Sequence, residues 1–185
     1  MLISFTGAQS TGKSTLLNRL VHDSKYRKCT FIKEVTRKVA AKNIKINEHG
    51  DDITQLMILN EHLNNHVLTG CVVLDRCILD GLIYTEWLYN QGNVSEWVYD
   101  YARNMHRLLV NKLDVIFYTD PSDVKLVDDG ERSVDEQFRQ DIIDAYDQYF
   151  RTNLHIKART VTLSGDVETR YKTIQQTFKN YEQVR

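Results

Sequence analysis

The chain has 185 residues, of which 42% are apolar and 26% are charged, and its formal net charge is -1. This length suits one domain with a sizeable core, and the near-zero charge argues against a broad nucleic-acid-binding surface, while leaving room for a local basic patch. No apolar run approaches the ~20 residues that cross a bilayer. The N-terminal residues show a strand pattern rather than a signal peptide, so we expect a cytoplasmic protein.

Apolar patterns predict strands that alternate with helices along the chain. Strands are expected at 2–6, 29–32, 71–74, 115–119 and 160–163, and helices at 13–24, 52–69, near 80–90, 95–112, 134–152 and 166–181. Such alternation indicates βαβ units, which build a parallel sheet with helices on both faces. Right-handed crossovers bring the C-terminal ends of the strands to one edge, where ligands of such sheets bind. Because no internal repeat or low-complexity segment occurs, we expect a single domain over residues 1–185.

The chain has three cysteines, Cys29, Cys71 and Cys77, and none of them forms a Cys-x-x-Cys pair. Each lies in or beside an apolar run. This number and placement favour buried, reduced thiols in a reducing compartment.

The segment from Gly7 to Ser14 matches the pattern G-x-x-x-x-G-K-[ST] at every fixed position. It stands between a predicted strand and a predicted helix, as this phosphate-binding motif requires. Glycines allow a tight loop whose N–H groups converge on phosphate oxygens, and the next helix adds the positive end of its dipole. We therefore predict a nucleoside triphosphate site, with Lys13 on the β- and γ-phosphates and Ser14 on Mg²⁺. Its residues are Gly7, Ala8, Gln9, Ser10, Thr11, Gly12, Lys13, Ser14 and Thr15.

Charged residues follow two other predicted strands at the same edge. Asp75 ends the third strand and is expected to hold Mg²⁺ through water or to accept a proton from an attacking hydroxyl. Arg76 follows and is expected to clamp a phosphate or substrate oxygen, unless the two side chains only neutralise each other. Glu34 and Arg37, after the second strand, share one helical face and either position the acceptor or form a surface ion pair. Whether Glu34 or Asp75 is the base is open.

The polar segment after the fourth strand, approximately 122–140, is predicted to be a lid. Ser133 is expected to cap the next helix, with Glu136 at the third helical position. A mobile loop here would exclude water and bring Arg132 or Arg139 to the transferring phosphoryl group. The alternative is a solvated charged loop.

Together these motifs resemble the small P-loop kinases of nucleosides and nucleotides, and more closely the ribosylnicotinamide-kinase-like group of compact AAA-type ATPases. The resemblance is carried by the cradle at 7–14, Glu34 with Arg37, Leu74-Asp75-Arg76, Leu79-Asp80-Gly81 and the segment 127–139. It implies an α/β P-loop NTPase fold, a three-layer sandwich whose five-stranded parallel sheet has the order 2-3-1-4-5. It also implies ATP as donor, Asp75 as the acceptor-side acid, and Arg132 and Arg139 as lid residues.

The expected function is an ATP- and Mg²⁺-dependent kinase of a nucleoside, a nucleotide or a related ribosyl metabolite. Its expected catalytic residues are Lys13, Glu34, Asp75, Arg76, Arg132 and Arg139, its substrate-binding residues are Glu34, Arg37, Asp75, Arg76 and Asp80, and its metal ligands are Ser14 and Asp75. The protein is expected in the cytoplasm of a bacterial or phage-infected cell. One alternative function is a phage-type kinase of a hydroxymethylated base in DNA. Another is a regulatory ATPase or GTPase switch without a small acceptor. No membrane partner is expected, and a homodimer is compatible with the sequence.

Three further patterns have simpler interpretations. The run 111–114 matches the guanine-reading pattern N-K-x-D, but the strand follows it, and no Asp-x-x-Gly accompanies it. His62 and His66 have a spacing that suits a metal, but the H-E-x-x-H carboxylate is missing, so two exposed histidines are expected. Six aromatic residues between Tyr84 and Tyr101 are expected to pack in the core or in a dimer interface, with base stacking as the alternative.

Overall fold

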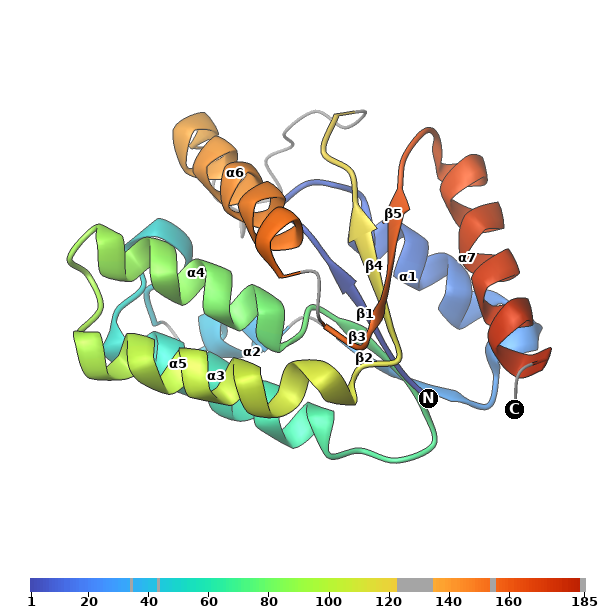
Figure 1. The fold of residues 1–185 in the computed structure, drawn as a ribbon, viewed down its shortest axis with the longest axis horizontal. Coiled ribbons are helices and arrows are strands. Elements are labelled where there is room, and N and C mark those ends of the chain that lie inside the picture. The colour runs from blue at the N-terminus through green and yellow to red at the C-terminus, as the bar shows by residue number, and fades with distance from the viewer. Residues whose placement is uncertain (34, 43, 123–134, 154–155, 184–185) are drawn as a thin grey trace.

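In the computed structural model, which describes residues 1–33, 35–42, 44–122, 135–153 and 156–183, five strands form one sheet (Figure 1). The strands are β1 (Leu2–Thr6), β2 (Cys29–Ile32), β3 (Cys71–Asp75), β4 (Val115–Thr119) and β5 (Arg159–Leu163). Their order is β2-β3-β1-β4-β5, and every neighbouring pair is parallel. The predicted P-loop NTPase order is therefore confirmed, and the C-terminal ends of the strands share one edge.

Helices connect these strands. They are α1 (Lys13–His22), α2 (Val35–Ala40), α3 (Asp52–His66), α4 (Ile78–Asn90), α5 (Glu96–Leu109), α6 (Glu136–Thr152) and α7 (Val167–Gln183), with 3₁₀ turns η1 (Ser24–Tyr26), η2 (Asn47–His49) and η3 (Val110–Lys112). The sequence patterns did not predict α2 as a separate helix, because six residues are too few to show a clear period. No helix in the described ranges is long and apolar enough to cross a membrane.

Both faces of the sheet are covered by helices, because successive residues of a strand point to opposite sides. Ile3 and Phe5 of β1 pack with side chains of α1 and α7. Val72 and Leu74 of β3 face the other way, where α4 and α6 cover them. Figure 1 shows the three layers, with α1 and α7 on one side of the sheet and α4 and α6 on the other. Most of the buried apolar side chains belong to these two layers. Full burial of one of them stabilises the fold by roughly 1.5–3 kcal/mol, so the two layers supply most of the stabilisation from the core.

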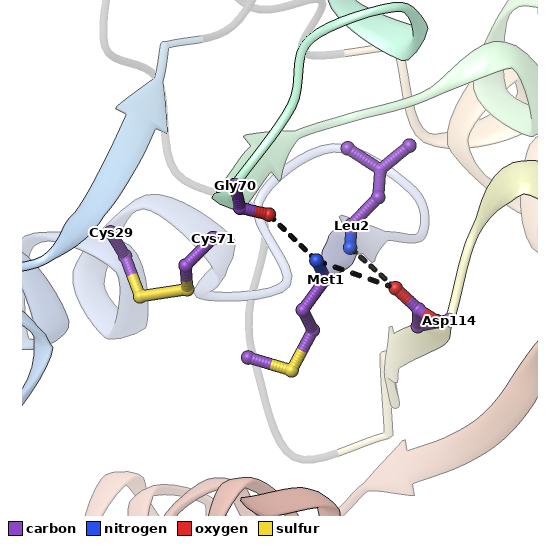
Figure 2. The surroundings of a disulfide bond; sticks show 6 residues. All are labelled: Met1, Leu2, Cys29, Gly70, Cys71 and Asp114. Atoms are coloured by element: carbon purple, nitrogen blue, oxygen red, sulfur yellow. Dashed lines mark hydrogen bonds and ion pairs between the residues drawn. A yellow bond between two sulfur atoms is a disulfide. The ribbon is translucent and has the colours of Figure 1, made fainter. Parts of the chain in front are cut away.

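Cys29 and Cys71 form a disulfide, so the prediction of three reduced thiols is wrong for these two residues. Cys29 begins β2 and Cys71 begins β3, and the parallel register sets them directly opposite each other, with their Cα atoms 4.5 Å apart (Figure 2). The pairing depends on strand register, which no local pattern reveals across a separation of 42 residues. Cys77 is a buried free thiol, as predicted, and burial raises its pKa to about 12.

The start of α6 also differs from the prediction. Asp135, not Ser133, caps this helix, because its side chain accepts a hydrogen bond from the backbone N of Phe138 at 2.9 Å. Either residue type can cap a helix, so the sequence alone did not separate them. Of the predicted lid at 122–140, the segment 123–134 lies outside the described residues, and the last five residues form the first part of α6.

Candidate functional site

The loop between β1 and α1 contains the predicted phosphate-binding motif and has a tightly bent backbone. Gly7, Ser10 and Gly12 have φ values of 131°, 55° and 87°. At Gly7 a side chain is excluded, because a Cβ atom would lie 2.7 Å from Oγ1 of Thr119 in β4. The loop therefore passes close over the end of the sheet and leads into the N-terminus of α1, where the helix dipole is positive.

Lys13 is the first residue of α1, and its side chain is buried against the loop. Its Nζ donates to the carbonyl oxygens of Gly7 at 2.9 Å and Ala8 at 2.6 Å, and to Oγ1 of Thr11 at 3.2 Å. The first turn of α1 contains no acidic residue. A buried ammonium group and a helix N-terminus thus meet in one small region, which electrostatically favours a polyanion such as a triphosphate.

Ser14 and Asp75 meet at the same edge although they are 61 positions apart. The Ser14 hydroxyl donates to Oδ2 of Asp75 at 3.3 Å, and Asp75 is buried at the end of β3. A hydroxyl and a carboxylate are hard oxygen ligands, the kind that Mg²⁺ takes when phosphate and water oxygens complete its shell. The pair therefore fits the predicted metal. Within the described part of the chain, no group of three or more His, Cys, Asp or Glu residues is arranged to hold a metal ion.

Arg76 points back toward the cradle. Its Nη1 donates to the carbonyl oxygen of Gly7 at 3.1 Å and to Oδ1 of Asp80 at 2.9 Å. Arg76 has a φ of 74°, a conformation that costs a residue with a Cβ of order 1–3 kcal/mol. Contacts with its surroundings must therefore offset this strain, and the ion pair with Asp80 is one of these contacts.

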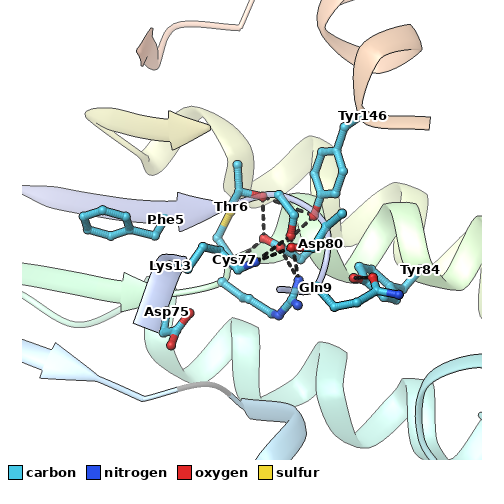
Figure 3. A network of polar contacts seen from close by, with 12 residues as sticks. Phe5, Thr6, Gln9, Lys13, Asp75, Cys77, Asp80, Tyr84 and Tyr146 are labelled. Atoms are coloured by element: carbon cyan, nitrogen blue, oxygen red, sulfur yellow. Dashed lines mark hydrogen bonds and ion pairs between the residues drawn. The ribbon is translucent and has the colours of Figure 1, made fainter. Parts of the chain in front are cut away.

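The carboxylate of Asp80 accepts hydrogen bonds from several protein donors (Figure 3). Besides Arg76, these are Oγ1 of Thr6 at 2.8 Å, the hydroxyl of Tyr146 at 2.7 Å and the backbone N of Cys77 at 2.9 Å. One buried carboxylate therefore links β1, α6 and the start of α4. Asp80 was expected to contact the acceptor. It does line the pocket described next, but its two oxygens hold Arg76 and the neighbouring elements in place.

A pocket opens beside the cradle. Its lining includes Arg76 and Asp80, together with Gln55 of α3 and Tyr84 of α4, whose hydroxyl donates to Oε1 of Gln9 in the cradle at 3.3 Å. The guanidinium of Arg76 lies over the ring of Tyr84, 5.2 Å from its centroid. Gln55 is buried, and the hydroxyl of Thr85 lies 2.9 Å from its Oε1. Gln55 was not predicted as a site residue, because a single glutamine on an amphipathic helix carries no motif.

His62 also lines this pocket, so the prediction that His62 and His66 are exposed is wrong. Only 1% and 3% of their surfaces are exposed. Burial lowers the pKa of His62 to about 3 and that of His66 to about 4, so both imidazoles are neutral at physiological pH. His66 Nδ1 is bonded to the backbone carbonyl of His62 at 2.7 Å, as expected for two residues one turn apart.

Arg139 of α6 also reaches the cradle. Its Nε donates to the carbonyl oxygen of Gln9 at 3.4 Å. One of the two predicted lid arginines thus contacts the phosphate loop from a regular helix. The other, Arg132, and the predicted acceptor-side residue Glu34 lie outside the described residues, and for Arg37 only the backbone within α2 is described.

The guanine-reading pattern lies at the opposite edge of the sheet. Asp114 precedes β4, and its carboxylate accepts from the backbone N of Leu2 at 2.7 Å (Figure 2) and from the hydroxyl of Tyr181 at 2.9 Å. Leu2 begins β1, whereas the cradle follows its end, and five strand residues span about 16 Å. Asp114 therefore cannot read the base of a nucleotide whose phosphates lie in the cradle.

The aromatic residues of α4 and α5 mostly pack against protein. Trp87 meets Phe138 edge to face at 4.5 Å, and Tyr89 stacks on Tyr99 at 4.8 Å. Tyr84 is the member of the group that lines the pocket. Packing is therefore the main use of these residues, and Tyr84 is the one placed to stack on a base in this pocket.

Solved structures with a similar fold are kinases and a related protein. A deoxyadenosine kinase from M. mycoides, with the products dCMP and a flexible dCDP bound, superposes with a TM-score of 0.73 and 17% identity, over 98% of this chain and 100% of that chain. The same enzyme with dATP bound gives 0.68 and 17%, over 97% and 99%. The NadR protein in complex with NR gives 0.68 and 20%, over 95% of this chain and 50% of NadR.

These identities are low, so the superpositions establish the fold, which confirms the resemblance to small P-loop kinases. No curated protein sequence matches this chain. A family profile described as an AAA domain matches residues 2–170. That range contains the cradle, Asp75, Arg76 and the pocket. Because the match covers most of the sequence, this chain belongs to that family of AAA domains.

Proposed function

We propose that this protein is an ATP- and Mg²⁺-dependent kinase that phosphorylates a nucleoside, a nucleotide or a related ribosyl metabolite. The observation that carries the proposal is that one residue, Arg76, both contacts the cradle and lines the pocket. Nη1 of Arg76 donates to the carbonyl oxygen of Gly7 in the cradle, and the same arginine lines the pocket. A donor phosphate in the cradle and a small acceptor in the pocket are then neighbours, which suits catalysis by positioning and electrostatics.

On the donor side, the N–H groups of the cradle and Lys13 hold the β- and γ-phosphates of ATP. Lys13 exchanges its hydrogen bonds with the carbonyls of Gly7 and Ala8 for bonds with phosphate oxygens. Ser14 and Asp75 would hold Mg²⁺, which would neutralise charge on the phosphates. Their contact at 3.3 Å supports this assignment, since it places the Asp75 carboxylate beside the end of the cradle.

On the acceptor side, Asp75 positions the attacking hydroxyl or takes its proton, and Arg76 stabilises negative charge on the transferring group. Glu34, which follows β2 in the sequence, is the alternative base, and Arg37 assists in holding the acceptor. Asp80 acts through Arg76, whose guanidinium it keeps beside Gly7.

Arg139 and Arg132 stabilise the phosphoryl group during transfer. The contact of Arg139 with the carbonyl oxygen of Gln9 supports its share of this role, because it brings a cation to the phosphate loop. Charge-assisted contacts of arginine with phosphate oxygens are strong and directional.

The pocket and the fold support the same class of acceptor. Its lining combines an amide, a neutral imidazole and an aromatic ring, groups that hydrogen-bond and stack on a nucleobase or a ribosyl group. The solved structures of similar fold contain dCMP in one case and NR in the other. At 17% and 20% identity they support a kinase-like fold.

The test is an incubation with ATP, Mg²⁺ and a panel of nucleosides, nucleoside monophosphates, nicotinamide riboside and hydroxymethylated DNA, followed by mass spectrometry. We expect one small member of the panel to be phosphorylated, and the product to disappear with Lys13→Ala. Lys112→Ala is the matched control, because Lys112 is exposed and follows α5 near the opposite edge of the sheet. Phosphorylated DNA alone would favour the phage-type alternative. ADP without any phosphorylated acceptor would contradict the proposal and favour a regulatory ATPase.

A further inference from the structure

We propose that Arg170 is a positioning residue for the donor nucleotide. Its guanidinium holds the peptide between Thr11 and Gly12 so that the N–H of Gly12 faces the phosphates. The inference rests on the proposed function only in taking ATP as the ligand of the cradle. Arg170 lies in the first turn of α7, where no sequence pattern drew attention to it.

Arg170 is 2% exposed and donates to carbonyl oxygens in loops that follow three different strands. Nη1 donates to Thr11 at 2.8 Å, Nη2 to Asp120 at 2.9 Å and Nε to Gly165 at 2.8 Å. Thr11 follows β1, Asp120 follows β4 and Gly165 follows β5. Because a guanidinium is planar and its N–H groups have fixed directions, it sets the mutual positions of the three loops.

The contact with Thr11 decides where the next N–H group points. The carbonyl of Thr11 and the N–H of Gly12 belong to one peptide unit, and in a trans peptide these groups point in opposite directions. The described residues contain no cis peptide bond. When Arg170 holds the carbonyl behind the loop, the N–H is directed away from Arg170 and into the cradle. An external hold is needed here, because Gly12, at φ 87°, has little conformational preference of its own.

The side chain of Thr11 is also held by a residue of β4, the strand that Asp120 follows. Oγ1 of Thr11 and Oγ1 of Thr119 share a hydrogen bond of 2.6 Å, and Thr119 is the last residue of β4. The contacts of Arg170 also lie toward β4 and β5, whereas the proposed acceptor pocket is lined by α3 and α4. We therefore expect Arg170 to affect binding of the donor and not of the acceptor.

The test measures binding of a non-hydrolysable ATP analogue with Mg²⁺ by calorimetry, without acceptor, for Arg170→Met and Arg170→Lys. Methionine keeps the length of the side chain without its donors. Lysine keeps the charge but replaces the fork by a single nitrogen. We expect the dissociation constant to rise at least tenfold in both variants, with folding checked by circular dichroism and thermal melting. If the methionine variant does not fold, the lysine variant carries the test.

Arg19→Met is the matched control, because Arg19 also joins α1 to α7, through Glu168, with Nη2 and Oε2 2.9 Å apart at the exposed surface. We expect it to bind the analogue within twofold of the wild type. With an identified acceptor, the Arg170 variants should raise the KM for ATP at least tenfold and leave the KM for the acceptor within twofold.

Folded Arg170 variants that bind the analogue like the wild type, or that raise both KM values alike, would overturn the inference. Failure of Arg170→Lys to fold would also overturn it, because the role would then be that of a structural residue. A wild type that binds the analogue tightly but phosphorylates no acceptor would instead contradict the proposed function and leave the binding comparison valid.

Discussion

Ser14, the last fixed residue of the phosphate-binding motif, donates a hydrogen bond of 3.3 Å to Asp75, the last residue of β3. The contact follows from the sheet order, because β1 and β3 are neighbours and Phe5 of β1 lies opposite Asp75 in the register. The side chain that ends β3 is therefore brought beside the start of the helix that follows β1.

Replacement of Asp75 by Asn tests this pair. The amide oxygen still accepts from Ser14, but the side chain carries no charge for Mg²⁺ and takes no proton. We expect kcat to fall roughly 10²–10⁴-fold while the dissociation constant for ATP changes much less. Steady-state kinetics and ATP titration measure the two effects. Ser14→Ala is the companion variant, and it should raise the Mg²⁺ concentration needed for half-maximal activity. Equal losses of turnover and ATP affinity in Asp75→Asn would contradict the role of Asp75.

Gly7 and Gly92 provide a comparison of two left-handed glycines. A Cβ at Gly7 would lie 2.7 Å from Oγ1 of Thr119, whereas nothing lies within 4 Å of a Cβ at Gly92. Both variants to Ala carry the backbone cost of positive φ, about 1 kcal/mol, but only Gly7→Ala also displaces the cradle. We expect loss of ATP binding in Gly7→Ala and normal binding in Gly92→Ala. Wild-type ATP affinity in Gly7→Ala would show that Thr119 moves aside at little cost.

The Arg76–Asp80 pair is buried, with 8% and 3% of the two side chains exposed. Removing one partner of a buried pair costs roughly 3–5 kcal/mol, so Asp80→Asn should lower the free energy of unfolding by that amount. Asp100→Asn is the control, because Asp100 pairs with Arg103 at the surface, and such pairs contribute about 0–1 kcal/mol. Urea unfolding of both variants provides the measurement. Similar values for the two would mean that the Asp80 network contributes little to stability.

Three buried histidines predict loss of stability in mild acid. Burial lowers the pKa of His62 to about 3 and of His66 and His106 to about 4. In the unfolded chain histidine titrates near 6.5, so between pH 6.5 and 4 the unfolded state binds more protons. The contribution is complete above pH 6.5 and is lost as the pH falls toward 4, by up to about 1.4 kcal/mol per pH unit for each histidine.

Urea unfolding between pH 7.5 and 4.5 measures this slope. His106→Gln should reduce the slope by about the share of one proton. An unchanged slope in His106→Gln would show that this histidine is already protonated in the folded protein.

The Cys29–Cys71 disulfide predicts one titratable thiol per chain when the protein is denatured without reductant, namely Cys77. The link joins residues 42 positions apart, so its reduction should lower the free energy of unfolding by roughly 3–4 kcal/mol. Thiol titration before and after reduction gives the count, and Cys77→Ser should bring the unreduced value to zero. Three thiols in the unreduced wild type would contradict the disulfide.

Most strands and long helices were predictable because their apolar periods are local. β2 and β4 have the predicted bounds, and α3 ends four positions before Gly70, the expected stop. Only a helical turn with Glu34 and Arg37 on one face was predicted where α2 forms, because six residues contain less than two turns of pattern. The first residue of α6 was misplaced because the region around it contains several residues that can cap a helix.

The cradle and the pocket of the candidate site also differed in how far the sequence predicted them. The cradle was predictable, because the loop and its following helix carry the whole signal within eight residues. Gln55, His62 and Tyr146 were not assigned to the site from sequence, since each belongs to a helix face that looks like ordinary packing. Their position beside Arg76 and Asp80 depends on how α3, α4 and α6 pack on the sheet.

By itself the sequence determined that this chain has a parallel α/β fold and a phosphate cradle, because strand and helix periods and the glycine-lysine loop are properties of neighbouring residues. Only the tertiary structure decided that Cys29 pairs with Cys71, that Asp80 holds Arg76, and that Arg170 contacts Thr11. The disulfide and the Arg170 contact join residues that are far apart in the chain. All three depend on strand register, on the packing of helices against the sheet or on the direction of a buried side chain, which a local pattern does not encode.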